Sequence, residues 1–303
     1  MGNSHSSTRI AIITDSVAQI PHNLVEEWNI RVVPMEVSIE GEKYHDGVDL
    51  QSEALYRRMR QDNNLRLSTG SPSAGDFYQV FLDALKAGAE CVLYVGLTSR
   101  LSSTFSAAEG GSMLVREELG QRQIVLYDTR IATIAQGFLV LEAARMAAEG
   151  ANTDQIIEHL NQERQRVGII AVLETLDYLS RGGRIGKAAY MMGSAIHIHP
   201  MVSLDEGGAV ASAGMCRSYH VALEKMVDYV EHRVAKLEKE GPARQGHSLK
   251  VAVMHADTLV WAEKLQQLVV ERLHPDEVFL TDFTPVMAVH TGPGLLGLAY
   301  HFK

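Results

Sequence analysis

The chain has 303 residues, a formal net charge of −9, and 46% hydrophobic and 21% charged residues. This length exceeds that of one ordinary core, so two globular domains are expected. The acidic excess argues against a nucleic-acid partner, which would require clustered Lys and Arg. The two cysteines, Cys91 and Cys216, make no disulfide framework or zinc cluster and fit a reducing, cytoplasmic setting.

Strand-like and helix-like runs alternate through the first half of the chain, after a polar start at 1–8 that we expect to be a flexible tail. Strands are predicted at 9–14, 32–39, 91–97 and 124–128, and helices at 77–88, after Leu101, at 138–150 and at 154–167. Near-continuous apolar strands that alternate with helices are typical of a parallel sheet covered on both faces. We therefore predict an N-terminal α/β domain over 9–167.

The pattern changes in the second half. A strand at 167–173 precedes a Gly- and Arg-rich segment, and strand-like pieces at 197–204 and 209–214 flank DEGG, a hairpin-turn signal. The remaining elements are a long one-faced helix at 218–240, a loop at 241–248, a strand at 250–256, a helix at 258–272 and a strand at 278–283. This mixture predicts a C-terminal α+β domain over 168–303.

The segment HTGPGLLG, 290–297, contains Gly292, Gly294 and Gly297 in the spacing G-x-G-x-x-G. That dinucleotide fingerprint is credible only between a strand and a helix. The residues that follow alternate like a strand, and Pro293 between two glycines fits a tight turn. Nucleotide binding is therefore disfavoured, and a strand–turn–strand with an incidental His290 stays open at this point.

Hydroxyl residues crowd three points where a helix should begin: STGSPS (68–73), GLTSRLSSTFSAA (96–108) and DTRIATIAQG (128–137). Free N–H groups and the helix dipole make such junctions anion sites, whereas plain N-capping explains the same residues without a ligand. Ser73 with Asp76 resembles a capping arrangement. In SRGGRIG, Arg181 and Arg184 flank a Gly pair and suit two-oxygen recognition of carboxylate or phosphate, although a solvated surface turn is the alternative.

Two further pairs could carry chemistry. His197 and His199 alternate along one strand, but no third ligand lies nearby, which disfavours zinc. Asp15 and Asp46 could form a catalytic pair, or they cap a helix and close a turn. Because no nucleophile–base–orienter triad is evident, we assign no catalytic residue. We also expect no metal and no cofactor.

Taken in order, these segments resemble the DegV family over essentially the whole chain after residue 8. The resemblance is carried by ITDSVAQIP, HDGVD, TGSPS, GLTSRLSSTFSAA, DTRIATIAQG, LDYLSRGGRIG, HPMVSLDEGG and HTGPG. The family is similar to the fatty-acid-binding subunit of bacterial fatty acid kinase. It implies one fatty acid held between two α/β domains, with its tail in an apolar tunnel.

The resemblance also implies roles for particular residues. The carboxyl head is expected to meet Thr69, Ser102 and His290, with help from Arg184 or, as an alternative, Arg181. The glycines of HTGPG then form a turn that holds His290 against the head group. A partner kinase subunit would bring ATP and phosphorylate the carboxylate, so the chain is expected to be a carrier rather than an enzyme.

Three positions depart from the usual pattern of the family. Gly70 and Ser71 stand where Ser and Gln are usual, and Ser103 replaces a Gly in the L-S-G-T motif. The loop that carries Thr69 and the turn at Ser102 are therefore expected to differ in geometry, with consequences for chain-length preference or kinase docking. None of these three changes removes an expected head-group donor.

Two functions stay open. A carrier of long-chain fatty acid in lipid metabolism gains about 0.8 kcal/mol for each buried methylene, or roughly 12 kcal/mol gross for a 16-carbon tail. The alternative is a free-standing enzyme that acts on a small phosphorylated or carboxylated substrate, for which Arg184 and His290 would serve equally well. The lack of a P-loop and of a metal set disfavours the enzyme. We expect a cytoplasmic carrier, for which transient contact with a membrane stays open.

Overall fold

The computed structural model describes residues 9–62, 64–120, 123–192, 198–240 and 248–303. The expected tail at 1–8, most of the predicted loop at 241–248, and His197 lie outside these ranges. Within them the predicted fold class, an α/β part with a parallel sheet followed by an α+β part, is confirmed.

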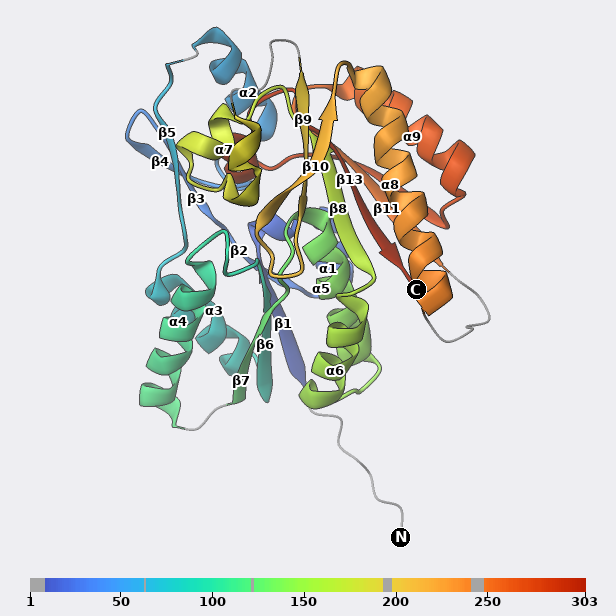
Figure 1. Cartoon of the computed structure of the whole chain (residues 1–303). Helices are drawn as coiled ribbons and strands as arrows, with labels where there is room; N and C mark the ends of the chain where they lie inside the picture. Colours follow the sequence, from blue (N-terminus) through green and yellow to red (C-terminus); the bar gives the residue numbers. More distant parts are fainter. Residues whose placement is uncertain (1–8, 63, 121–122, 193–197, 241–247) are drawn as a thin grey trace.

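The first sheet is parallel and has four strands. They are β1 (Ile10–Asp15), β2 (Arg31–Val33), β6 (Cys91–Gly96) and β7 (Gln123–Asp128), in the order β2-β1-β6-β7. Helices α3 (Ala74–Lys86) and α4 (Thr104–Leu119) cover one face, and α5 (Thr133–Ala148) packs on the other (Figure 1). Every residue of β6 is buried, as a strand covered on both sides requires.

The second sheet has six strands in the order β10-β9-β8-β13-β11-β12. They are β8 (Val167–Val172), β9 (His199–Leu204), β10 (Val210–Cys216), β11 (Leu249–His255), β12 (Glu277–Asp282) and β13 (Leu296–Phe302). Neighbours run antiparallel except β11 and β12. Helices α8 (Tyr219–Glu240) and α9 (Leu259–Leu273) cover the outer face of this sheet (Figure 1).

Helix α5 lies between the two sheets and packs against β1 and β6 of the first and β8 and β13 of the second. Its residues 133–140 are all buried. A helix covered on all sides is expected to be apolar around its circumference, and the run FLVL at 138–141 has that character. Helix α6 (Thr153–Glu163) follows α5 and packs against it.

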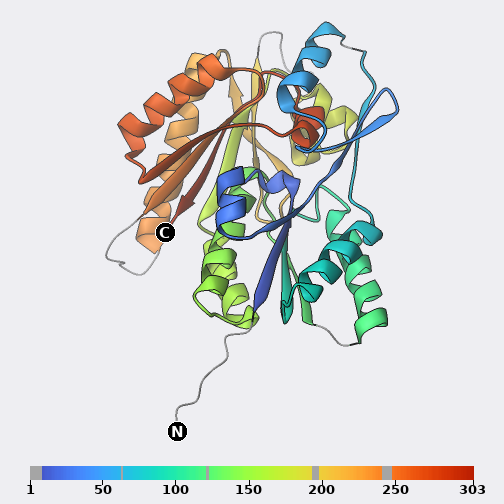
Figure 2. The ribbon, with the colours of Figure 1, turned by 180° about the vertical axis from the view of Figure 1, so that it is seen from behind.

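A small antiparallel sheet and short helices close one end of the space between the large sheets. Its strands are β3 (Glu36–Ile39), β4 (Glu42–His45) and β5 (Leu67–Gly70), and the helices include α2 (Ser52–Gln61), α7 (Asp177–Arg181) and α10 (Pro285–Thr291). The remaining short elements are η1 (Ser16–Ala18), α1 (His22–Glu27) and η2 (Gly186–Met191). Helix α10 packs against α2, α7, β3 and β5, so a late segment of the chain meets early ones (Figure 2).

Several predicted elements are wrong in detail. The strand expected at 32–39 is two strands in different sheets, because Pro34 lacks the N–H that a continuous ladder needs. The helix expected to reach residue 167 ends at Glu163, and Val167 opens β8. Thr69, expected in a loop, lies in β5, and His290 lies in a helix that the sequence analysis missed.

Candidate functional site

A narrow cavity lies between the two large sheets, beneath α10. Its walls are apolar apart from a few side chains: Thr69, Ser102, Arg184, Ser203, His290 and Thr291. The cavity volume is about 90 Å³, which is small for a space lined by residues from so many elements. Such a shape suits a slender apolar ligand better than a bulky one.

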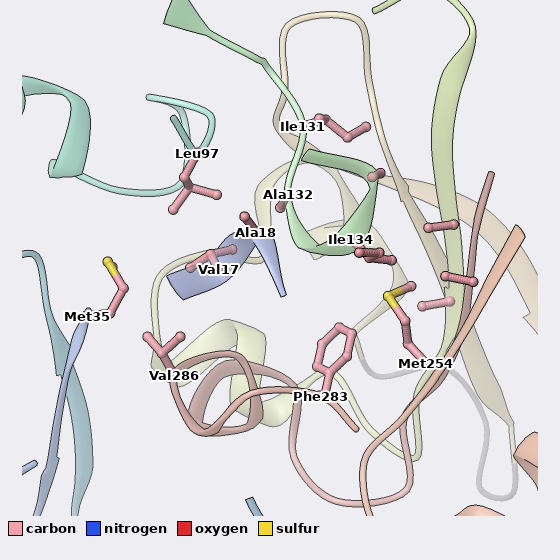
Figure 3. Close-up of a cluster of buried hydrophobic side chains, with 14 of the residues drawn as sticks. Val17, Ala18, Met35, Leu97, Ile131, Ala132, Ile134, Met254, Phe283 and Val286 are labelled. Carbon is pink, nitrogen blue, oxygen red and sulfur yellow. The ribbon is translucent and has the colours of Figure 1, made fainter. Parts of the chain in front are cut away.

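The apolar walls come from loops that the strands of the first sheet position. Val17 follows β1, Leu97 follows β6 and Ala132 precedes α5, while Phe283 precedes α10 and Val286 lies in its first turn. Figure 3 shows these side chains gathered around one centre. On the opposite wall, β8 contributes Ile169 and Ala171, and Leu173 directly after the strand continues the same alternation.

Thr69 and His290 form the centre of the polar end. The Thr69 Oγ1 and His290 Nε2 atoms are 2.8 Å apart, and both residues are partly buried. Burial, and then the positive charge of Arg184, lower the pKa of His290 to about 4. The imidazole is therefore neutral at physiological pH, with one ring nitrogen as a donor and the other as an acceptor.

Ser102 belongs to a cluster of hydroxyl groups beside this pair. Its Oγ lies 2.8 Å from Thr104 Oγ1 and 3.1 Å from Ser71 Oγ, and Ser71 Oγ lies 2.8 Å from Ser103 Oγ. Ser71 therefore bridges two hydroxyl-rich motifs, a role that the sequence analysis did not assign. Ser103 has φ −80° and ψ 5°, which needs no glycine, so the departure there costs no backbone strain.

The structure separates the two candidate arginines. Arg184 lines the cavity, and its guanidinium donates to the carbonyl oxygens of Leu101 at 3.0 Å and Gly182 at 2.5 Å. Arg181 is exposed, stacks on the Tyr178 ring at 5.1 Å and does not line the cavity. The side chain of Arg184 thus positions the backbone next to Ser102 while its charge faces the polar end.

Two buried carboxylates hold the frame of the site. Asp46 Oδ1 accepts from the Val286 N–H at 2.9 Å, at the start of α10, and burial raises the pKa of Asp46 to about 6. Asp15 caps η1 by accepting from Val17 N at 3.2 Å and also accepts from Leu97 N at 2.9 Å. The capping interpretation of Asp15 is correct, and Asp46 holds a distant helix.

Glycines set the distance between α7 and α10. A Cβ on Gly182 would lie 2.3 Å from His290 Nδ1, and a Cβ on Gly292 would lie 2.3 Å from Tyr178 Cδ2. Gly292 also has φ +75°, which favours glycine. The glycine pattern at the end of the chain therefore serves helix termination and close packing beside His290.

An outer pocket adjoins the polar end. Thr69, Arg184 and His290 line both this pocket and the cavity, and exposed Arg66 and Arg181 line its outer part. The polar end of the cavity can therefore be reached from outside through a cationic opening.

The structure brings together Thr69, Ser102, Arg184 and His290, the four residues named from the sequence, at one end of one cavity. The pair His197 and His199 is not described as a pair, since only His199 lies within the described ranges. Those ranges contain no group of three or more His, Cys, Asp or Glu side chains arranged to hold a metal ion.

The family model described as "Uncharacterised protein, DegV family" matches residues 9–303. The chain belongs to the DegV family. A DegV domain-containing protein from Halalkalibacterium halodurans is 32% identical over 98% of this chain and 99% of its own length.

Two solved structures share the fold. A fatty-acid-binding DegV family protein from Thermus thermophilus has 26% identity and a TM-score of 0.86, over 97% of this chain and 100% of its own. A stearic acid-binding protein from Eubacterium ventriosum has 25% identity and a TM-score of 0.87, over 96% of this chain and 98% of its own. Within the described residues of this DegV protein, none of the helices has the length and apolarity that a bilayer span requires.

Proposed function

We propose that this DegV protein binds a long-chain fatty acid, with the tail in the cavity and the carboxyl head at Thr69, Ser102, Arg184 and His290. The observation that carries the proposal is the cavity itself, whose mostly apolar lining includes all four residues of this polar cluster. The similar proteins from Thermus thermophilus and Eubacterium ventriosum, described as binding a fatty acid and stearic acid, support the same ligand class.

The chemistry of the cluster suits a carboxylate. Removing a carboxylate from water is costly unless donors and an opposite charge replace its hydration. Arg184 supplies the charge, and the hydroxyls of Thr69 and Ser102 and the neutral ring of His290 supply hydrogen bonds. The methylenes supply most of the affinity at about 0.8 kcal/mol each, and the cluster fixes the position of the head.

We propose further that a separate ATP-binding kinase subunit phosphorylates the bound head group. A carboxylate oxygen would attack the γ-phosphorus, the bond between that phosphorus and the β–γ bridging oxygen would break, and ADP would leave with the electron pair. The outer pocket supports this role, because it reaches Thr69, Arg184 and His290 from outside the cavity. The chain then acts in the cytoplasm as a carrier, with domains at 9–167 and 168–303.

Solvent extraction of the purified protein followed by mass spectrometry tests the ligand class. We expect a long-chain acid, either co-purified or taken up on incubation. Delipidated protein should also prefer hexadecanoate over 1-hexadecanol, because the alcohol keeps the tail and lacks the carboxylate. Repeated absence of bound acid, or equal affinity for the two ligands, would contradict the proposal.

The kinase step has its own test. With the ATP-binding subunit of a bacterial fatty acid kinase, Ser102→Ala and His290→Ala should lower acyl-phosphate formation more than they lower hexadecanoate affinity. Unchanged turnover in both variants would remove the assigned head-group roles. Turnover of ATP or a phosphoester by the isolated chain would favour the alternative, a free-standing enzyme acting on a small phosphorylated or carboxylated substrate.

A further inference from the structure

A second pocket lies behind the tail cavity. Ile169 of β8 and Leu204 of β9 line both spaces, so the wall between them is formed by these side chains. None of Thr69, Arg184 or His290 lines this second pocket. It is therefore distinct from the head-group cluster and from the outer pocket beside it.

The lining of this rear pocket is rich in positive charge. Arg130, Arg164, Arg233 and Lys236 contribute four cationic side chains, against the two carboxylates of Asp205 and Glu206. The volume of this pocket is about 440 Å³, much more than the 90 Å³ of the tail cavity. The lining of this pocket is therefore net positive, although the whole chain has a net charge of −9.

Three separate elements deliver the arginines. Arg130 lies between β7 and α5, Arg164 ends α6, and Arg233 lies within α8. Burial raises the pKa of Tyr127, while the charges of Arg164 and Arg130 act on the same hydroxyl in the opposite direction. Arg130 and Arg164 therefore lie near each other, and Arg233 comes from α8, which covers the outer face of the six-stranded sheet.

The carboxylates near the pocket leave these arginines without a close counterion. Asp205 forms a salt bridge with Lys187 at 2.7 Å and accepts from turn N–H groups. Glu206 is exposed and acts on Arg233 through its charge. Across the described ranges, none of Arg130, Arg164 and Arg233 has a carboxylate oxygen within salt-bridge distance.

A buried hydroxyl completes the polar lining. Arg233 Nε donates to the Tyr300 hydroxyl at 3.2 Å, and Tyr300 is 1% exposed. Because the oxygen of Tyr300 accepts this bond, its own proton can be donated to a ligand. A Cβ on Gly168 would lie 2.3 Å from the same oxygen, so glycine at 168 makes the space for it.

We propose that the rear pocket binds a phosphate-type oxyanion through Arg130, Arg164, Arg233 and the Tyr300 hydroxyl. Planar guanidinium groups match pairs of phosphate oxygens, and these three arginines line one pocket without close counterions. The phosphate comes from a soluble phosphate ester or from a phospholipid head group, since both present the same oxygens. This site is independent of fatty acid binding and lies across a wall from the tail rather than at the head.

Titration calorimetry with inorganic phosphate tests the site. The ionic strength is held constant with chloride, because an open cationic pocket is screened by salt. We expect saturable binding by the wild-type protein and at least tenfold weaker binding by Arg164→Gln/Arg233→Gln. The matched control, Arg57→Gln/Arg58→Gln, removes two positive charges from the exposed face of α2 and should bind as the wild type does.

Flotation with phosphatidylglycerol and phosphatidylcholine vesicles identifies the source of the phosphate. Retention on phosphatidylglycerol vesicles that is lost in Arg164→Gln/Arg233→Gln assigns the site to a head group, and binding of free phosphate alone assigns it to a soluble ester. Failure to bind either probe, or equal binding by the pocket and control variants, overturns the proposal. Arg130→Gln replaces the double variant if the latter does not fold. Hexadecanoate binding should be unchanged in all of these variants, which separates this site from the proposed function.

Discussion

The Thr69 hydroxyl lies 2.8 Å from Nε2 of His290, although 221 positions separate the two residues in the chain. One belongs to a four-residue strand of the small sheet, and the other to a seven-residue helix. Neither element is long enough to be stable alone, so each depends on its packing against the other parts of the molecule. The polar end of the cavity therefore forms only when these distant segments pack together.

Asp46 is expected to control that packing, because its carboxylate holds the first turn of α10. Asp46→Ala leaves the Val286 N–H buried without its acceptor, and we expect a loss of about 1–3 kcal/mol in the free energy of unfolding. Hexadecanoate binding should weaken as well, because α10 carries His290. Urea denaturation measures the first effect. The control Glu53→Ala, at an exposed ion pair on α2, should change stability by about 0.5 kcal/mol or less, and an equally small loss in Asp46→Ala would contradict the role.

The pH dependence of stability should report the neutral state of His290. Its pKa is about 4 in the folded protein against an ordinary value of 6.5, so the unfolded chain takes up the proton first as the pH falls. The stability from this neutral histidine is complete above pH 6.5 and declines as the pH falls toward 4, by about 3 kcal/mol at most. We expect wild type to lose stability relative to His290→Gln across this window.

The pKa of Asp46 is shifted in the opposite direction to that of His290, so the pH dependence of the wild-type protein alone would mix the two effects. The measurement therefore compares wild type with His290→Gln. Its pKa is raised from 3.8 to about 6, so its contribution is present below 3.8 and is lost as the pH rises through 6. Both proteins carry Asp46, and the difference between their urea midpoints at pH 7.5, 6 and 4.5 isolates His290. A difference that does not vary with pH would mean that His290 is not held neutral.

The sequence predicted the parts of the site that rest on local signals. Ser73 and Asp76 form the expected capping box at the start of α3, and the hydroxyl-rich run at 96–108 does join β6 to α4. Strongly apolar strands such as β6 were also found within a residue or two of their bounds. These features depend on neighbours in the chain, which a single sequence shows directly.

The parts that were missed depend on contacts between distant segments. Helix α10 has too few residues to show a period, and its N-terminal acceptor, Asp46, lies 240 positions away. The contacts of Ser71 with Ser102 and Ser103 could not be predicted, because the two motifs meet only in the folded chain. Three separate segments of the chain contribute Arg130, Arg164 and Arg233 to the rear pocket, so no spacing along the sequence predicts it.

Gly182→Ala should disturb the head-group site although it substitutes none of the polar residues there. The added Cβ would lie 2.3 Å from His290 Nδ1, so the imidazole must move away from Thr69. We expect the preference for hexadecanoate over 1-hexadecanol to fall about tenfold, which corresponds to roughly 1.4 kcal/mol. Competition binding with the two ligands measures it. Gly75→Ala, whose Cβ would meet its nearest atom at 3.5 Å, is the control, and an equal preference in both variants would contradict the positioning role.

Ala171→Leu should shorten the space available to the tail. Ala171 is 2% exposed and lies on the cavity face of β8 between Ile169 and Leu173, so added methyl groups enter the path of the acyl chain. Displacing two or three methylenes at about 0.8 kcal/mol each should weaken octadecanoate binding by roughly 2 kcal/mol, with a smaller effect on dodecanoate. Competition binding with the two acids measures this chain-length effect.

The matched control for this change is Ile170→Leu. Ile170 packs on the opposite face of β8, in the core beneath α8 and α9, where a volume-conserving swap costs less than about 1.5 kcal/mol of stability. It should leave the ratio of the two affinities unchanged, and thermal melts of both variants show whether the fold is kept. If Ala171→Leu weakens both acids equally while remaining folded, the tail does not run along β8 as far as residue 171, because only a ligand that reaches the added methyl groups distinguishes chain lengths.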